Sequence, residues 1–241
     1  MYDFKSRVRY SEVNSDRQMT VPALVDYLQN CCSFQSEDMN IGVDYLEKHQ
    51  VAWVLSSWEI QVKRYPDFAE MVTVSTWPYS FKGFYGYRNF TIRDAAGEIC
   101  VFANSVWVFM NTETMRPMRV TEEVEQAYVR EFEEQIAYDW SDRKIKIDGD
   151  GEEKEPVLVQ RFFIDTNHHM NNGKYILVAE EFLPEDFKVE SIRVEYKKSA
   201  ILGDRLHPVV YNKEEDVVTV ALTDDEKKPY AVVEFKRKKE C

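Results

Sequence analysis

A short polar segment in the second half of the chain holds the residue types that hydrolysis requires. Asp165, Asn167 and His169 alternate there, after an apolar run that ends at Ile164 and before a helical pattern that begins near Lys174. A histidine can take a proton from water near neutral pH, and unpaired backbone N–H groups at the start of a helix can stabilise a negative oxygen. The segment therefore predicts hydrolysis of an acyl group.

Two other interpretations of the segment stay open. In the first, Asp165 and Asn167 only cap the following helix, and His169 is a surface residue of the loop. In the second, Asp165, His168 and His169 bind a metal ion. Adjacent histidines rarely point at one ion, and the sequence holds no third strong ligand cluster, so we expect no metal.

The composition of the 241-residue chain is that of a folded globular protein, with 44% hydrophobic and 31% charged residues. Its net charge of −12 argues against a nucleic-acid-binding protein, because phosphate groups require a basic surface. No run reaches the roughly 18 apolar residues of a membrane span, and the N-terminal segment resembles neither a signal peptide nor a transit peptide. We expect a cytoplasmic protein without membrane insertion.

The four cysteines predict neither a disulfide nor a metal site. Cys31 and Cys32 are adjacent, which is a poor arrangement for a mutual bridge, and Cys100 and Cys241 complete no CxxC pattern. We expect reduced thiols with structural roles.

An internal repeat predicts two similar domains. The segment from Arg9 resembles the segment from Phe162, each reading as a strand, a polar loop and a helix. Pairing Tyr10 with Phe163 gives an offset of 153 residues, which places Glu12 opposite Asp165, Asn14 opposite Asn167 and Asp16 opposite His169. Further on, the segments from Glu59 and Arg193 resemble each other at an offset of 134 residues.

Periodicity predicts a helix followed by an antiparallel meander in each half, which is an α+β fold. Thr20 can cap the first helix, which has Pro22 in its first turn and a stripe of Val21, Leu24, Val25, Leu28 and Cys32. Strands are expected near residues 58–62, 72–76, 85–93 and 99–109, with a turn that ends at Gly97. An acidic helical stretch covers 121–135. We expect domains at 1–140 and 157–241, joined by a polar linker at 141–156.

The pattern Asp165-x-Asn167-x-His169-x-Asn171-Asn172 resembles that of the plant and bacterial acyl-acyl carrier protein thioesterases. The first half is similar to the same family at Trp53-Val54, Ser75-Thr76-Trp77, Arg88-Asn89-Phe90 and Ala103 to Trp107. Nearly the whole chain is covered by the resemblance.

This resemblance implies two tandem hot-dog folds, each a long helix packed against an antiparallel sheet. It also implies an enzyme of fatty acid biosynthesis that hydrolyses fatty acyl-acyl carrier protein to a free fatty acid and the phosphopantetheine thiol of the carrier, without a cofactor. By the same resemblance His169 activates water, Asn167 orients or polarises the thioester, and Asp165 holds the site in the right geometry. Asn171 and Asn172 are supporting residues.

One departure from the family lies at Ser199 and Ala200, where the plant relatives carry Glu-Cys. A cysteine nucleophile is therefore excluded, and a mechanism based on water is favoured. If a strand covers 193–198, Glu195 lies on the same face as Ser199 and can replace the missing carboxylate, although a solvent-facing Glu195 is the simpler interpretation.

Two binding roles are expected. The basic residues Arg193, Lys197 and Lys198 lie beside the predicted site in sequence and can guide an acidic carrier protein, although a solvated face explains them equally well. The first copy lacks the histidine, so we assign it a binding and structural role. Its apolar residues can line an acyl tunnel or simply form a core: Leu24, Leu28, Trp53, Leu55 and Trp58.

Alternative functions are an acyl-CoA thioesterase of the same fold and a non-catalytic acyl-binding protein, with a hot-dog dehydratase ranked behind them. A monomer and a homodimer are both compatible with two fused hot-dog folds.

Overall fold

The computed structural model describes residues 1–238, and its contacts divide the chain into two compact units. Unit 1 comprises Met1–Ser56 and Val62–Trp140. Unit 2 comprises Ser57–Gln61 and the chain from Ser141 onward. Within the described residues, no helix is long and apolar enough to cross a membrane. Cys31, Cys32 and Cys100 are free thiols, and Cys241 lies outside the described residues.

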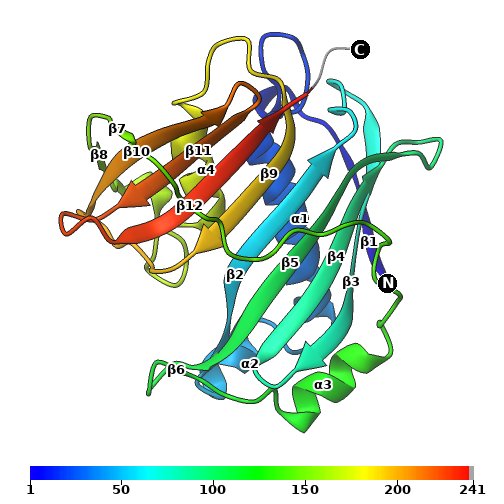
Figure 1. Ribbon diagram of the computed structural model, residues 1–241. Helices are drawn as coiled ribbons and strands as arrows, with labels where there is room; N and C mark the ends of the chain where they lie inside the picture. The colour runs from blue at the N-terminus through cyan, green and yellow to red at the C-terminus, as the bar shows by residue number, and fades with distance from the viewer. Residues whose placement is uncertain (239–241) are drawn as a thin grey trace. The chain divides into compact units, whose positions relative to one another are not determined.

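Unit 1 is an antiparallel sheet in the order β1-β3-β4-β5-β2 with helix α1 against it (Figure 1). Its elements are β1 (Tyr2–Arg7), the 3-10 turn η1 (Tyr10–Glu12), α1 (Val21–Asp38), α2 (Val43–Lys48), β2 (Val51–Val62), β3 (Met71–Lys82), β4 (Tyr85–Arg93), β5 (Ile99–Asn111), β6 (Arg116–Pro117) and α3 (Glu122–Val129). The strands predicted at 85–93 and 99–109 are confirmed, and Gly97 has the positive φ, +87°, that the turn between them requires.

Helix α1 begins where the sequence predicts. Thr20 caps it by accepting a hydrogen bond from Ala23 N (3.3 Å). Its buried stripe faces β3 and β1, with one correction: Cys31 is fully buried and Cys32 only partly, so the stripe ends on Cys31. The Cys31 thiol donates to Val74 O (3.5 Å) on β3, and burial raises its pKa. The expectation of a reduced, structural thiol fits this environment.

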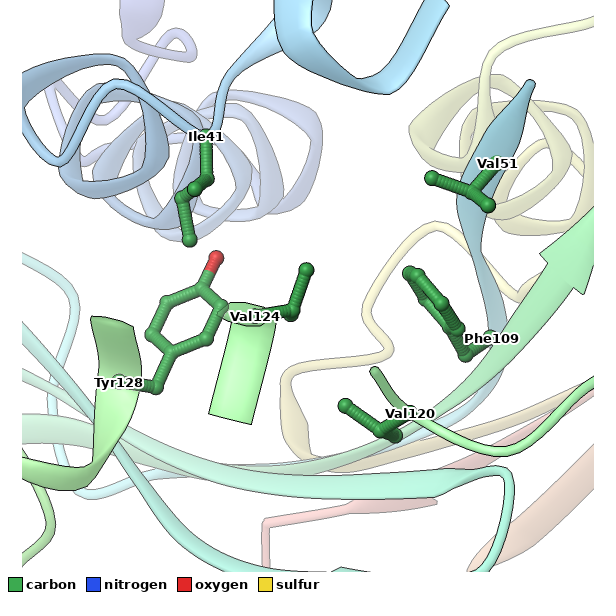
Figure 2. Packing of buried hydrophobic residues seen from close by; sticks show 6 residues of the cluster. All are labelled: Ile41, Val51, Phe109, Val120, Val124 and Tyr128. Carbon is green, nitrogen blue, oxygen red and sulfur yellow. The ribbon is translucent and has the colours of Figure 1, made fainter. Parts of the chain in front are cut away.

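A second apolar cluster lies between helix α3 and the rest of unit 1. Figure 2 shows its buried members, which are Ile41, Val51, Phe109, Val120, Val124 and Tyr128. Helix α3 ends at Val129 and is therefore shorter than the predicted acidic stretch. The chain then continues extended, with Glu134 O accepting from Trp77 Nε1 (2.9 Å) and Ile136 N donating to Asn89 Oδ1 (2.9 Å).

The strands of unit 2 are antiparallel and follow the order β9-β12-β11-β10-β7, with helix α4 against β11 and β12. Its elements are β7 (Glu152–Glu153), β8 (Val157–Leu158), the 3-10 turn η2 (Arg161–Phe163), α4 (Asn172–Glu180), β9 (Val189–Tyr196), β10 (Arg205–Glu214), β11 (Val217–Thr223) and β12 (Pro229–Arg237). Residues 57–61 of β2 pair with β9. Helix α4 has nine residues against the 18 of α1, so the helix of the second half is the shorter one.

The two units repeat the same local hydrogen bonds, which confirms the internal repeat and corrects one of its offsets. An isolated bridge joins Val13 to Met19 in unit 1 and Ile164 to Met170 in unit 2, an offset of 151 residues (164 − 13). The predicted offset of 153 is therefore wrong. That offset came from aligning the acidic-x-Asn sequence that both segments share, whereas the structure places Asn14 opposite Asp165.

The second predicted offset, 134 residues, is confirmed. Met19 N donates to Pro66 O in unit 1, and Met170 N donates to Ala200 O in unit 2, both at 2.8 Å (200 − 66 = 134). Equivalent loops therefore meet in the same way in both units.

We expect Thr20→Ala to lower the free energy of unfolding by about 1 kcal/mol, because the first turn of α1 loses its cap. Thr20→Ser, which keeps the hydroxyl, is expected to stay close to the wild-type value. Urea denaturation followed by circular dichroism measures both variants. Equal losses in the two would assign the effect to the threonine methyl group instead of the cap.

Candidate functional site

The predicted catalytic segment is a closed loop between η2 and α4. Asp165 Oδ1 accepts hydrogen bonds from the backbone N–H groups of Asn167 (2.8 Å) and His169 (3.4 Å). The backbone closes the same loop, since Asp165 N donates to His169 O (2.8 Å) and His168 N to Asp165 O (3.1 Å). His168 adopts a positive φ, 60°. The Asp165 carboxylate thus fixes the backbone that carries Asn167 and His169.

The helix that follows is capped by a different residue from those predicted. Asn171 is the N-cap of α4, and its Oδ1 accepts from Gly173 N (2.9 Å). Asn172 O accepts from the Tyr196 hydroxyl (2.9 Å) on β9. The interpretation in which Asp165 and Asn167 cap the helix is therefore wrong. Asn171 and Asn172 support the loop by fixing α4, and Asn167 is left exposed and His169 half-buried.

The loop of Ser199 and Ala200 lies directly against the predicted catalytic segment. Met170 N donates to Ala200 O (2.8 Å), and Ala200 N donates to the buried Tyr175 hydroxyl (2.8 Å) on α4. Burial raises the pKa of Tyr175 to about 12, so this hydroxyl stays neutral. The exposed Ser199 is thereby brought next to the loop, although it sits beyond the end of β9 at Tyr196.

Glu195 does not share a face with Ser199, so the prediction that it replaces the missing carboxylate is wrong. Tyr196 packs its ring on Tyr175 of α4, and Glu195, its neighbour in β9, points to the opposite face of the sheet. There its carboxylate accepts from Ile145 N (3.1 Å) and pairs with Lys197 Nζ (2.8 Å).

Residues 141–153, which we call the strap, cross that opposite face of the unit 2 sheet (Figure 1). Ser141 N donates to Glu59 Oε2 (2.8 Å), Ile145 packs on β11 and β12, and Glu152 and Glu153 pair with β10. The polar stretch predicted as a linker is therefore bound along the sheet. Burial raises the pKa of the Glu59 carboxyl that anchors the start of the strap.

The three basic residues predicted to guide a carrier protein do not form one surface. Arg193 is half-buried under the strap, pairs with Glu234 (2.5 Å) and donates to Asp142 O (2.7 Å). Lys197 lies on the same side beside Glu195, whereas Lys198 pairs with Asp224 (2.7 Å) in a loop. Arg193 is thus committed to internal contacts.

Among residues 1–238, the grouping of acidic, cysteine and histidine side chains spaced for a metal ion is Glu70, Asp94 and Cys100, far in sequence from Asp165, His168 and His169. The Arg64 guanidinium already pairs with Glu70 (2.6 Å) and Asp94 (2.8 Å). A bound arginine therefore supplies the positive charge at this point of unit 1.

Unit 1 contains the same loop without the histidine. Asn14 Oδ1 accepts from Asp16 N and Gln18 N, both at 3.0 Å, as Asp165 does from Asn167 and His169. The expectation that the first copy lacks the histidine is confirmed, with Gln18 rather than Asp16 at its position. The loop backbone is thus common to both units, and the side chains predicted to be catalytic are specific to unit 2.

Sequence reasoning missed a buried polar group in unit 1. The Arg88 guanidinium donates to Gln35 Oε1 on α1 and to Thr76 Oγ1 (3.0 Å), and lies over the Tyr128 ring (5.2 Å). Arg88 and Gln35 are both buried, and no periodic pattern marks such a pair because they come from different elements.

The residues predicted to line an acyl tunnel are buried or partly buried. Leu24, Leu28, Leu55 and Trp58 are buried, and Trp53 is partly buried.

Known proteins match both units of the chain. The family model of the acyl-ACP thioesterase N-terminal domain matches residues 1–128, and that of the C-terminal domain matches residues 147–235. The chloroplastic acyl-[acyl-carrier-protein] hydrolase FATB1 of Cuphea viscosissima is 30% identical over 218 residues, which cover 84% of this chain and 52% of that protein. The chain spans about half the length of the first curated relatives it matches.

Two solved structures share the fold over nearly the whole chain. An acyl-ACP thioesterase from Bacteroides thetaiotaomicron superposes with a TM-score of 0.89 at 21% identity, covering 98% of this chain and 97% of that one. The 12:0-ACP thioesterase from Umbellularia californica gives 0.86 at 21% identity, covering 99% and 97%. The predicted α+β, tandem hot-dog architecture is confirmed.

Glu180 at the end of α4 makes the stability of unit 2 dependent on pH. Burial, with a smaller contribution from Glu181, raises the pKa of Glu180 from 4.5 to about 7. The folded state thus binds the proton more tightly than the unfolded state, and the stabilisation present below about pH 4.5 is lost as pH rises through 7.

We expect Glu180→Gln, which stays neutral, to exceed the wild type by about 1–3 kcal/mol in unfolding free energy at pH 8 and to match it at pH 4. Denaturation across this pH range measures the difference. The exposed Glu185→Gln is the matched control, and an identical profile for both variants would contradict the role of burial at Glu180.

Proposed function

Because the chain belongs to the acyl-ACP thioesterase family, we propose that it hydrolyses the thioester of fatty acyl-acyl carrier protein. The products are a free fatty acid and the phosphopantetheine thiol of the carrier. The observation that carries this proposal is the loop of Asp165, Asn167 and His169, built on the same backbone as its counterpart in unit 1 but holding a half-buried histidine.

His169 is the general base of the proposed reaction. A water molecule attacks the thioester carbonyl carbon while the imidazole accepts one of its protons. The C–S bond then breaks, and the protonated imidazole returns the proton to the leaving thiolate. Water and thioester are consumed, carboxylic acid and thiol are formed, and no other reactant is needed.

Asn167 and Asp165 act on geometry and charge. The exposed Asn167 amide is the proposed donor to the thioester oxygen. Gly173 N in the first turn of α4 is already bonded to Asn171. Asp165 is a positioning residue, since its carboxylate holds the Asn167 and His169 backbones. Ser199 and Ala200 supply neither a carboxylate nor a thiol, which supports attack by water over a covalent intermediate.

An acyl-CoA thioesterase uses the same loop chemistry, so the substrate carrier is decided by kinetics. Assays with one acyl chain on acyl carrier protein and on CoA compare kcat/KM directly. We expect the carrier protein ester to be preferred, and the cytoplasm stays the predicted location.

We expect His169→Ala to lower kcat on acyl carrier protein esters by about 10²- to 10⁴-fold, the usual contribution of a positioned general base. Gln18→Ala changes the equivalent position in unit 1 and is the matched control, with activity near wild type. The activities of the two variants are compared after thermal unfolding has shown that both are as stable as the wild type. Retention of activity in a folded His169→Ala enzyme would remove His169 from the mechanism.

Asp165→Asn separates the structural role of Asp165 from its charge. Asn14 closes the unit 1 loop with an amide oxygen, so the Asp165→Asn variant is expected to keep the loop intact, whereas Asp165→Ala loses both hydrogen bonds. If positioning dominates, the asparagine variant retains at least about a tenth of wild-type kcat, and the alanine variant falls at least about 100-fold. Equal losses in both would show instead that the negative charge is required.

A further inference from the structure

Four large apolar side chains of unit 2 are exposed on two neighbouring segments. Phe162 is 67% exposed, Leu202 53%, Ile201 51% and Leu158 49%. Single exposed apolar residues are normal, but a group of them marks a surface that a partner covers. These four residues with Arg161 and Arg205 are called the Phe162 face below.

Backbone hydrogen bonds hold the two segments of the Phe162 face together. Val159 N donates to Asp204 O (2.9 Å), Gly203 N donates to Val159 O (3.0 Å), and Leu158 pairs with Arg205. In unit 1 the two equivalent segments are in side-chain contact, since the ring centroids of Tyr10 and Phe68 lie 5.9 Å apart. The offsets of 151 and 134 make Arg161 and Leu202 their counterparts.

The Phe162 face borders the proposed catalytic loop. Phe163 O, one residue after Phe162, accepts from Asn171 N (2.8 Å). Ala200 O, one residue before Ile201, accepts from Met170 N (2.8 Å). Both segments of the face are therefore bonded directly to the backbone that follows His169.

The charge of the Phe162 face is opposite to that of the whole chain. Arg161 and Arg205 are exposed, and within the described residues neither is ion-paired. Asp204, the acid between them, is turned inward, because its Oδ2 accepts from Ile201 N (3.0 Å) and the Tyr230 hydroxyl (3.0 Å). A basic and apolar surface on a chain of net charge −12 selects an acidic partner with apolar residues of its own.

We propose that the Phe162 face is the docking surface for the acidic carrier protein that delivers the acyl chain. This inference rests on the proposed function, whose substrate partner it places on unit 2. Apolar side chains at its centre exclude water, and the two arginines steer the encounter. It replaces Arg193, which is half-buried under the strap, as the centre of recognition.

Two variants and a matched control test the proposal. Phe162→Ser/Leu202→Ser removes the apolar centre, and Arg161→Glu/Arg205→Glu reverses the charge. Tyr10→Ser/Phe68→Ser removes the exposed aromatic pair of unit 1, whose counterparts in unit 2 are Arg161 and Leu202, and is the control on the other unit. Each is assayed with one acyl chain on acyl carrier protein and on phosphopantetheine without the carrier. Thermal unfolding confirms that each variant folds.

In both unit 2 variants, we expect the ratio of kcat/KM on the carrier ester to kcat/KM on the carrier-free ester to fall at least about tenfold, mainly through KM. The control keeps the wild-type ratio. An equal fall on both esters, an unchanged ratio, or dissociation of a wild-type dimer by the variants in light scattering would overturn the proposal.

Calorimetric titration with unacylated carrier protein separates the two proposals. If the wild type binds the carrier and the unit 2 variants lose that binding, docking at the Phe162 face stands even where no thioester is hydrolysed. If hydrolysis is observed but carrier binding is the same in all variants, the proposed function stands and the docking surface is wrong.

Discussion

One carboxylate oxygen, Asp165 Oδ1, holds the backbone on which the proposed chemistry depends. It binds the N–H groups of both Asn167 and His169, so these residues are positioned together and not separately. Connecting segments are ordinarily the most mobile parts of a fold, while reacting groups must be placed within fractions of an ångström. The side-chain bonds, the bridge from Ile164 to Met170 and the bond to Ala200 resolve this conflict by tying the loop at several points.

The unit 1 loop shows which features belong to the scaffold and which to the chemistry. Arg17 and His168, at the offset of 151, both have positive φ, 64° and 60°, although neither is a glycine. Such a conformation is uncommon for non-glycine residues and is frequently associated with active sites. Since unit 1 keeps it without a histidine at position 18, the strain here serves the loop conformation. What distinguishes unit 2 is the chemical identity of Asp165, Asn167 and His169.

Local patterns predicted most of the fold, and contacts between distant segments set the limit. Strand β4 and the start of β5 follow from alternation and from the turn at Gly97. The end of β9 could not be predicted in this way. The N–H groups of Lys197 and Lys198 both donate to Tyr230 O, which breaks the alternation, and nothing in the sequence Tyr-Lys-Lys indicates this break. The candidate catalytic residues could be found from their spacing in the sequence, but the partners of Glu195 and Arg193 lie about 50 residues away in the strap.

Unit 2 includes five residues, 57–61, that come from the middle of the first half of the sequence and pair with β9. The two copies are therefore not modules that can be exchanged at a single crossover point. A chimaera that takes its second half from another member of the family keeps the native edge of β9 only if this short segment is transferred with it. Recombination or inheritance of the halves as independent genes would leave β9 with unpaired backbone groups, which are a site for aggregation. A substitution at residues 57–61 therefore acts on the sheet of the second half.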